Sequence, residues 1–227
     1  GLEAVLSEEE EKCQLLTGLG INVNLGPVCD IATDSGAFLY SRSLGQDAET
    51  TSQVVSAIVN LMNQNHVGSV LKHFPGYGNN ADTHTGIAMD SRSLAELEGK
   101  DLLPFAAGIQ AGCGAVMVGH VIVEAMDGSL PASLSPAVHE YLRDTMGFTG
   151  VIMTDDLVMQ AITDQYGAGE AAVMAVLAGN DLLCSTEYAT QYQAVLQAVL
   201  DGRISVDTLN AAVRHVLVWK QQVASYG

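Results

Sequence analysis

The sequence predicts an α/β fold built on a parallel sheet, and three observations support this. Short apolar segments alternate five times with longer segments whose apolar residues recur at helical spacing. The short segments are apolar throughout, which is typical of strands covered by helices on both faces. Polar residues follow them, at Asp30, Lys72-His73, His120, Asp155-Asp156 and Ser185. Because the carboxyl ends of parallel strands share one edge, we expect an incomplete (β/α)8 barrel, with an open doubly wound sheet as the alternative.

In the first part of the chain, two helices and two strands are expected. Segment 2–16 is rich in Glu and Leu, and segment 50–64 repeats apolar residues at helical spacing, so both predict helices. Segment 21–25 alternates apolar and polar residues and leads to a strand tip at Asp30. Segment 67–74 begins as a β-branched apolar run bounded by turn residues, which predicts a buried strand.

Capping signals mark the helices that follow. Ser93 and Glu96 form a capping box that opens a helical segment, which Pro104 should kink or restart. Ser135 is an N-cap followed by proline at the first helical position, and Gly147 is a suitable stop for that helix. The remaining expected elements are strands at 115–118, 150–153 and 181–184 and helices at 167–178, 187–200 and 206–221.

Composition indicates one globular domain. With 227 residues, 48% of them hydrophobic, the chain can bury one sizeable core, so residues 1–227 are expected to form a single domain. It has no run of 18 apolar residues, and therefore no membrane span is expected. A net charge of −17 excludes nucleic acid as a partner, because phosphate would be repelled over most of the surface.

The cysteines indicate in which cellular compartment the protein is expected. The four cysteines show no CxxC spacing, and three lie in or beside apolar, strand-like runs, so buried free thiols are expected. Free thiols favour a reducing compartment, and hence the cytoplasm. The first residues lack a basic, then apolar, signal-like profile, and an exported form stays open if an upstream signal has been removed.

The most informative segment runs from Lys72 to Gly78 and is followed closely by Asp82 and His84. Lys72 and His73 stand at the carboxyl end of an expected buried strand. A loop rich in Gly and Asn then carries a carboxylate and an imidazole two residues apart. Charged groups at the end of a buried strand cost free energy, which favours a functional role for the cluster. A turn with an exposed histidine is the alternative.

Together with five other segments, residues 72–84 resemble the signature of the N-acetylglucosaminidase branch of glycoside hydrolase family 3. The other segments agree in order, at 26–30, 42–45, 131–135, 147–157 and 178–182. The resemblance covers nearly the whole chain and implies a catalytic (β/α)8 barrel domain. Tyr77 stands where the family more often has histidine, at a loop position that should tolerate the change.

The sequence departs from the family at its start. The family's barrel begins with two earlier β/α units, and the sugar-binding Asp-Gln-Glu-Gly-Gly strand end of the second is not found here. The chain is therefore expected to form about the C-terminal two-thirds of the barrel. Self-association or a partner chain would cover the open edge. As an isolated piece, the chain is expected to be inactive or very weak on a chromogenic N-acetylglucosaminide.

The resemblance implies retaining hydrolysis of β-linked N-acetylglucosamine from small glycans, such as cell-wall or chitin-type fragments, without a metal or other cofactor. Asp155 matches the nucleophile, and His84, held by Asp82, matches the acid/base group. An imidazole with an ordinary pKa of about 6.5 can donate and accept a proton near neutral pH. Capping of the next segment is the alternative role for Asp155 and for Asp156, and Asp156 is equally suited to hydrogen bonding into the rim.

Six further residues are expected to contact the substrate: Asp30, Arg42, Lys72, His73, His120 and Met159. Arg42, Lys72 and His73 would hold sugar hydroxyls or the acetamido carbonyl, and His120 would form part of the pocket wall. A salt-bridge network with Asp30 or Asp155 is the alternative for the three cationic or titratable residues. Both roles are compatible. A core position is the alternative for Met159.

Other functions remain open at this point. A β-N-acetylglucosaminide phosphorylase of the same fold would use the same residues, since a histidine acid/base repels phosphate less than a carboxylate does. A metal-dependent hydrolase would use His73, Asp82, His84 and His120, although metal sites favour closely spaced ligands on rigid strands. An inactive fragment or sugar-binding remnant is the third alternative.

Overall fold

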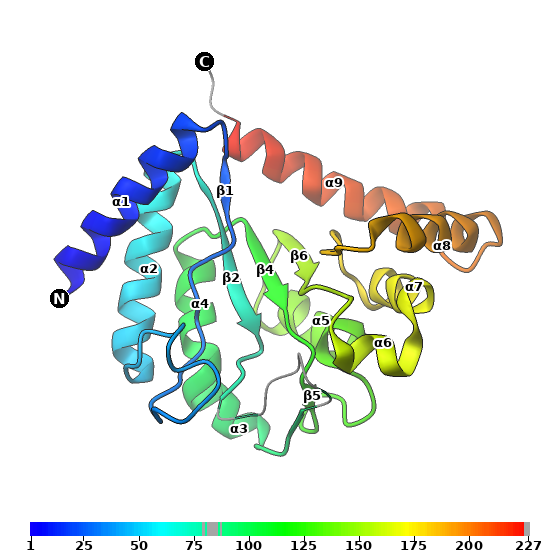
Figure 1. Ribbon diagram of the computed structural model, residues 1–227, viewed down its shortest axis with the longest axis horizontal. Helices are drawn as coiled ribbons and strands as arrows, with labels where there is room; N and C mark the ends of the chain where they lie inside the picture. The colour runs from blue at the N-terminus through cyan, green and yellow to red at the C-terminus, as the bar shows by residue number, and fades with distance from the viewer. Residues whose placement is uncertain (79, 81–85, 87, 225–227) are drawn as a thin grey trace.

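The computed structural model describes residues 1–78, 80, 86 and 88–224. Its centre is a parallel sheet with strands in the order β1, β2, β4, β6 (Figure 1). These strands are β1 (Val23–Asn24), β2 (Gly68–Phe74), β4 (Ala115–Val118) and β6 (Val151–Thr154). Single bridges from Val28 to Lys72 and from Met153 to Leu182 extend the sheet on both sides. Within the described residues the sheet is open rather than closed into a barrel.

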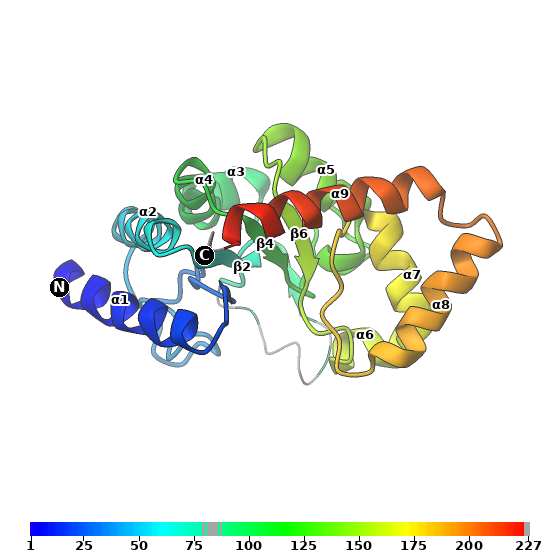
Figure 2. The ribbon, with the colours of Figure 1, turned by 90° about the horizontal axis from the view of Figure 1, so that it is seen from above.

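Helices lie around the sheet and connect its strands (Figures 1 and 2). The α-helices are α1 (Leu2–Gly18), α2 (Ala48–Gln64), α3 (Leu94–Glu96), α4 (Leu102–Gln110), α5 (Pro136–Glu140), α6 (Gln160–Tyr166), α7 (Ala168–Ala178), α8 (Tyr188–Leu200) and α9 (Val206–Val223). The C-terminal end of α9 crosses the amino ends of the strands, where Trp219 packs against Gly68 and Gly114. The opposite, carboxyl edge of the sheet is therefore the edge at which the polar strand ends lie.

The predicted helix caps are confirmed. The Ser93 hydroxyl accepts a hydrogen bond from the Glu96 N–H, and the Glu96 carboxylate accepts one from the Ser93 N–H, which completes the capping box of α3. The Ser135 hydroxyl accepts from the Val138 N–H at the start of α5. Gly147 has φ of 67°, the left-handed conformation that ends this helical segment. Each cap satisfies backbone groups that a helix end leaves unpaired.

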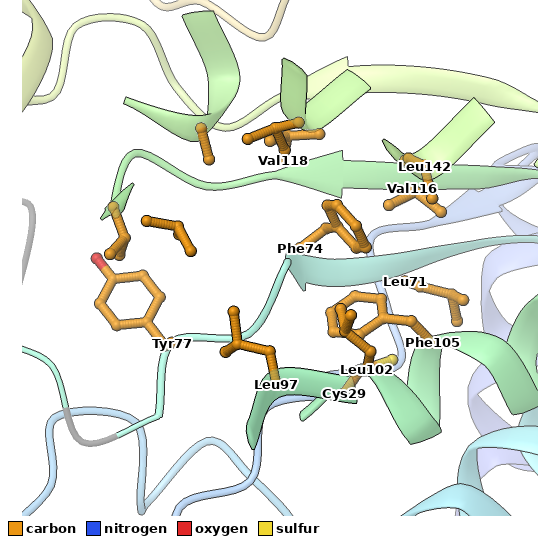
Figure 3. Close-up of a cluster of buried hydrophobic side chains, with 14 of the residues drawn as sticks. Cys29, Leu71, Phe74, Tyr77, Leu97, Leu102, Phe105, Val116, Val118 and Leu142 are labelled. Carbon is orange, nitrogen blue, oxygen red and sulfur yellow. The ribbon is translucent and has the colours of Figure 1, made fainter. Parts of the chain in front are cut away.

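The main hydrophobic core lies between the sheet and helices α2 and α4 (Figure 3). Leu71 and Phe74 of β2 and Val116 of β4 point into it, and Phe74 meets Phe105 of α4 edge to face at 5.3 Å between ring centroids. Complete burial of an aromatic side chain of this kind contributes about 3–5 kcal/mol, judged by the usual cost of its truncation to alanine. This core anchors β2, the strand that carries Lys72 and His73.

The opposite face of the sheet forms a second, smaller core. Val70, Met117 and Met153 pack there against Trp219 of α9. Lys72 lies two residues after Val70 on the same strand, and its pKa responds to the charge of Asp155. Side chains two apart on a strand share a face, so Lys72 extends this apolar layer to the carboxyl edge and ends it with a charge.

Four features were not expected. Strands β3 (Met89–Asp90) and β5 (Ile122–Val123) form a separate two-stranded parallel sheet. Helix α6 precedes the predicted helix at 167–178. The helical segment opened by Ser93 contains a π-helical turn, Leu97–Asp101, before Pro104, and this turn is where the predicted restart occurs. A second π-helical turn, Tyr141–Thr145, follows α5.

Candidate active site

Polar side chains from successive strands meet at the carboxyl edge of the sheet. Val118 pairs with Thr154 in the register, and the Asp155 N–H continues the ladder by donating to the Val118 carbonyl at 3.0 Å. On the other side of β4, the Gly119 N–H donates to the Phe74 carbonyl at 3.0 Å. The residues that follow these strands, His120 and Asp155, therefore lie at the same level as the end of β2. The common edge expected for the candidate residues is present.

Asp30 and His73 form a buried pair at this edge. One Asp30 oxygen, Oδ2, lies 2.8 Å from His73 Nδ1 and accepts the His73 backbone N–H at 2.9 Å. The other, Oδ1, accepts the Tyr77 N–H at 2.7 Å. Asp30 is 1% exposed. Because an ionised carboxylate only accepts hydrogen bonds, Nδ1 carries the hydrogen and Nε2 remains as the second polar atom of the ring. The expected network at the rim thus includes the hydrogen-bonded pair of His73 and Asp30.

His120 is held by protein atoms at both ring nitrogens. Nε2 lies 3.0 Å from the Asp156 carbonyl oxygen, and Nδ1 lies 2.7 Å from the Ser133 hydroxyl. A carbonyl can only accept, so Nε2 donates and Nδ1 accepts from Ser133. Burial lowers the pKa of His120, against an opposing effect of the Asp155 charge, which agrees with a neutral ring. His120 therefore supports the backbone that carries Asp155 and Asp156.

The two adjacent aspartates have different surroundings. Asp155 is half-buried, and its Oδ1 accepts the Asp156 N–H at 2.8 Å. Asp156 Oδ1 accepts the Val158 N–H at 3.1 Å and the Thr186 N–H at 3.4 Å. The Asp156 carboxylate thereby links two rim loops. Helix α6 begins only after Met159, so neither aspartate is its N-cap.

Lys72 supplies positive charge near Asp155, and Arg42 lies within range of Lys72. Burial lowers the pKa of Lys72, and the charge of Arg42 lowers it further, while Asp155 and Asp30 oppose both effects. Lys72 is therefore close enough to all three to respond to their charges. Arg42 is exposed and lines a cavity of about 290 Å³ between α1, α2 and the end of β1.

The other candidates are placed less directly. Met159 is buried and precedes α6, which fits its alternative as a core residue. Asp82 and His84, the expected acid/base pair, lie outside the described residues, and their pairing stays a prediction.

No three His, Cys, Asp or Glu side chains of the described part of the chain come together in a group that could hold a metal ion. No described helix is long and apolar enough to cross a membrane.

Sequence reasoning missed two supports of the site. Ser133, the partner of His120, lies in the segment 131–135 that carried part of the resemblance, so its position gave a usable signal. Arg92 carries no such signal, because its partners Gly76, Asp90 and Asp101 come from three separate segments. Only the folded chain brings these groups together.

The sequence of this chain is similar to that of known protein families and relatives. A family model described as the Glycosyl hydrolase family 3 N terminal domain matches residues 10–218. The chain is 36% identical over 212 residues to a beta-hexosaminidase of Stenotrophomonas maltophilia (strain K279a), with 86% of this chain and 62% of that protein covered. It is 33% identical over 214 residues to beta-hexosaminidase LpqI of Mycobacterium tuberculosis (strain ATCC 25618 / H37Rv), with 89% of this chain and 55% of that protein covered.

Solved structures agree with these sequence matches. A glycoside hydrolase family 3 beta-N-acetylglucosaminidase from Paenibacillus sp. str. FPU-7 superposes on the whole chain with a TM-score of 0.94 at 35% identity. The match covers 45% of that structure's chain. The chain thus spans 62% or less of the proteins named here. The predicted fold class, a (β/α)8-type barrel present in part, is confirmed.

Proposed function

The chain belongs to glycoside hydrolase family 3, and from that premise we propose that its protein is a retaining β-N-acetylglucosaminidase. The proposed substrates are small glycans that end in β-linked N-acetylglucosamine. Relatives named beta-hexosaminidase and a structural neighbour named beta-N-acetylglucosaminidase support this substrate class. The single observation that carries the proposal is the position of Asp155, which follows β6 at the edge shared with Lys72 and the Asp30–His73 pair.

In the proposed first step, a carboxylate oxygen of Asp155 attacks the anomeric carbon of the sugar. The bond from that carbon to the glycosidic oxygen breaks, and His84 gives a proton to the departing oxygen. The hydrogen bond from the Asp156 N–H orients the Asp155 carboxylate, and Lys72 supplies a positive charge at the same edge. The product of this step is a covalent sugar ester on Asp155.

In the proposed second step, His84 takes a proton from water, and the water oxygen attacks the anomeric carbon. The ester bond breaks and the Asp155 carboxylate is regenerated, so the released sugar keeps its β configuration. Asp82 would hold the imidazole in one tautomer and keep it protonated when substrate arrives. A histidine suits both steps because it exchanges a proton near neutral pH.

The remaining candidates are proposed to bind the sugar. Since the hydrogen on Nδ1 of His73 is directed to Asp30, Nε2 is the ring atom suited to a sugar hydroxyl. Lys72 and Arg42 would donate to hydroxyl or acetamido oxygens. His120 is proposed to shape the pocket through the Asp156 backbone, and Met159 to support the same loop from the core.

Trapping the covalent intermediate tests the proposal. In the full-length protein, His84→Ala should form the sugar ester with a dinitrophenyl N-acetylglucosaminide, which needs no acid, and should hydrolyse it slowly. Intact mass should rise by one sugar residue, and fragmentation should place the sugar on Asp155. An adduct on Asp156, or no adduct together with unaltered turnover, would refute the assignment. Adding inorganic phosphate distinguishes the phosphorylase, which would release a sugar phosphate.

A further inference from the structure

Arg92 connects three segments of the chain beneath the candidate active site. Its Nε lies 2.9 Å and 3.0 Å from the two carboxylate oxygens of Asp90, and its Nη1 donates to Asp101 at 2.6 Å. Its Nη2 donates to the Gly76 carbonyl at 3.2 Å. Asp90 and Asp101 are almost fully buried. One guanidinium thereby joins the end of the Lys72–Gly78 segment to β3 and to the π-helical turn before α4.

The glycines of this segment are explained by the ion cluster below them. A Cβ on Gly76 would lie 2.9 Å from Asp101 Cβ, and a Cβ on Gly78 would lie 2.7 Å from Arg92 Cζ. Both glycines also have positive φ, 111° and 55°. Any larger residue would displace the backbone from Arg92 or force a strained conformation. Close contact between this backbone and Arg92 is thus built into the motif.

The contact reaches Asp30 through a single peptide unit. The carbonyl of Gly76 accepts from Arg92, and the N–H of the same peptide, on Tyr77, donates to Asp30 Oδ1 at 2.7 Å. The peptide dipole therefore has a cation at its oxygen and a carboxylate at its hydrogen, and both contacts favour the same orientation. Asp30 Oδ2 in turn holds His73 Nδ1.

We propose that Arg92 is a positioning residue that fixes the Asp30 carboxylate through the Gly76–Tyr77 peptide and thereby holds His73 in its Nδ1–H form. Arg92 contacts neither Asp30 nor His73 among the described hydrogen bonds, so it acts through the backbone. The inference rests on the proposed function in one respect, because that function supplies the sugar that the Nε2 atom of His73 would bind. The contacts themselves exist without substrate.

The charge of Arg92 is permanent. Burial opposes the charged form, but hydrogen bonds to Asp90 and Asp101 outweigh burial and raise the pKa of Arg92 above its ordinary range. The guanidinium fork also matters, because it makes bidentate contact with Asp90 while it reaches Asp101 and Gly76. A lysine ammonium is a point charge and cannot reproduce all of these contacts.

Arg92→Lys is the test, with Arg143→Lys as the matched control. The side chain of Arg143 is 23% exposed against 26% for Arg92. Arg143 also pairs with an aspartate, Asp181, and donates to two backbone carbonyls, but near the amino end of β6. Both changes preserve charge and disturb a partly buried ion pair. Only Arg92→Lys should disturb Asp30 and His73.

Two NMR measurements on the full-length protein need no substrate. They are the ¹⁵N signals of the His73 ring, identified by their loss in His73→Gln, and the hydrogen exchange of the Tyr77 amide. In Arg92→Lys we expect the Nδ1–H form of His73 to be replaced by a mixture of tautomers. The Tyr77 amide should exchange its hydrogen about 10- to 100-fold faster, because this is the size of effect expected when a charged hydrogen bond is lost. Arg143→Lys should leave both signals as in the unmodified protein.

Identical His73 and Tyr77 signals in the two variants would overturn the inference, whatever the activity. If Arg92→Lys does not fold, Asp101→Asn replaces it, because it removes one anchor of Arg92 and should shift the same signals less. Turnover of an aryl N-acetylglucosaminide then gives the functional readout, and we expect kcat/KM to fall about 10-fold or more in Arg92→Lys alone. Absence of turnover in the unmodified protein would count against the proposed function and leave the NMR result to decide on Arg92.

Discussion

The two ends of the sheet carry similar sets of residues that are arranged differently. At the carboxyl edge, Asp30 accepts a backbone N–H and pairs with Nδ1 of His73 at 2.8 Å. At the amino end, Asp181 accepts the Ile152 N–H and pairs with Nδ1 of His215, also at 2.8 Å. An arginine belongs to each set. Arg143 binds Asp181 directly at 2.6 Å, whereas Arg92 is separated from Asp30 by one peptide.

The difference shows that an aspartate, a histidine and an arginine can stabilise the fold at one end of the sheet and orient a side chain at the other. Direct pairing with Arg143 balances the charge of Asp181, and His215 is about one-third exposed, so this set fastens α9 to the sheet. At the carboxyl edge, the arginine leaves the Asp30 carboxylate to His73, whose ring is 4% exposed. The Asp30 oxygens are thus taken up by the His73 ring and by the backbone N–H groups of His73 and Tyr77, which fixes the orientation of the imidazole.

The largest effects should come from aspartate changes at the two ends. Asp155→Asn at the carboxyl edge should reduce turnover of an aryl N-acetylglucosaminide by at least about 1,000-fold, because it removes the proposed nucleophile. The melting temperature should change little, since Asp155 is only half-buried. Steady-state kinetics and thermal unfolding of the full-length protein measure the two quantities.

Asp181→Asn at the amino end is the counterpart. It leaves Arg143 without its carboxylate and should cost about 3 kcal/mol of unfolding free energy, as for other buried pairs that lose one partner. Turnover per folded molecule should be retained. If Asp181→Asn abolished turnover in well-folded protein, the division of the sheet into a stabilising end and a reacting end would be wrong.

A smaller effect, selective for the substrate, is expected from His84→Ala. Loss of a general acid should reduce turnover by about 10²- to 10⁴-fold for glycosides with poor leaving groups. Glycosides with good leaving groups should form the covalent intermediate at nearly the unmodified rate. A plot of kcat/KM against leaving-group pKa measures this, and an equal loss across the series would contradict the role of His84 as proton donor.

Much of the fold was accessible from the sequence because it depends on local signals. The strand at 67–74 has a β-branched apolar run, Ser93 and Ser135 are caps with fixed spacing, and Gly147 marks a positive φ. Parallel order then places the polar strand ends at one edge, so the meeting of Asp30 with His73 across 43 positions could be anticipated in outline.

What escaped prediction depends on tertiary contacts without a local signal. Strands β3 and β5 are two residues each, too short to show any periodicity. Arg92 lies in a polar stretch and gains its role only where Gly76, Asp90 and Asp101 converge. The sequence shows glycines at positions 76 and 78, but the reason for them lies in the side chains of Asp101 and Arg92 packed against them.

The smallest expected effect is a change of stability with pH, and it involves one buried histidine at the carboxyl edge and one in the helical layer. Burial lowers the pKa of His120 at the edge and of His139 in α5. Below the ordinary histidine pKa of about 6.5, the unfolded chain binds a proton at each site while the native ring stays neutral. The unfolded state then holds more protons, so stability falls as pH decreases, by up to about 1.4 kcal/mol per pH unit and histidine.

Urea unfolding at pH values from roughly 7.5 to roughly 5, on both sides of that pKa, measures this loss of stability. In His120→Asn the loss should be roughly halved, because the amide retains a donor for the Asp156 carbonyl and an acceptor for Ser133 but does not titrate. His66→Asn is the control, since it removes an exposed histidine with φ of 57°, a conformation that asparagine tolerates. An unchanged slope in His120→Asn would mean that the ring is not kept neutral beneath Asp155. In that case the proposed nucleophile would have a cation as its neighbour, and the Asp156 carbonyl would be held by a charged donor.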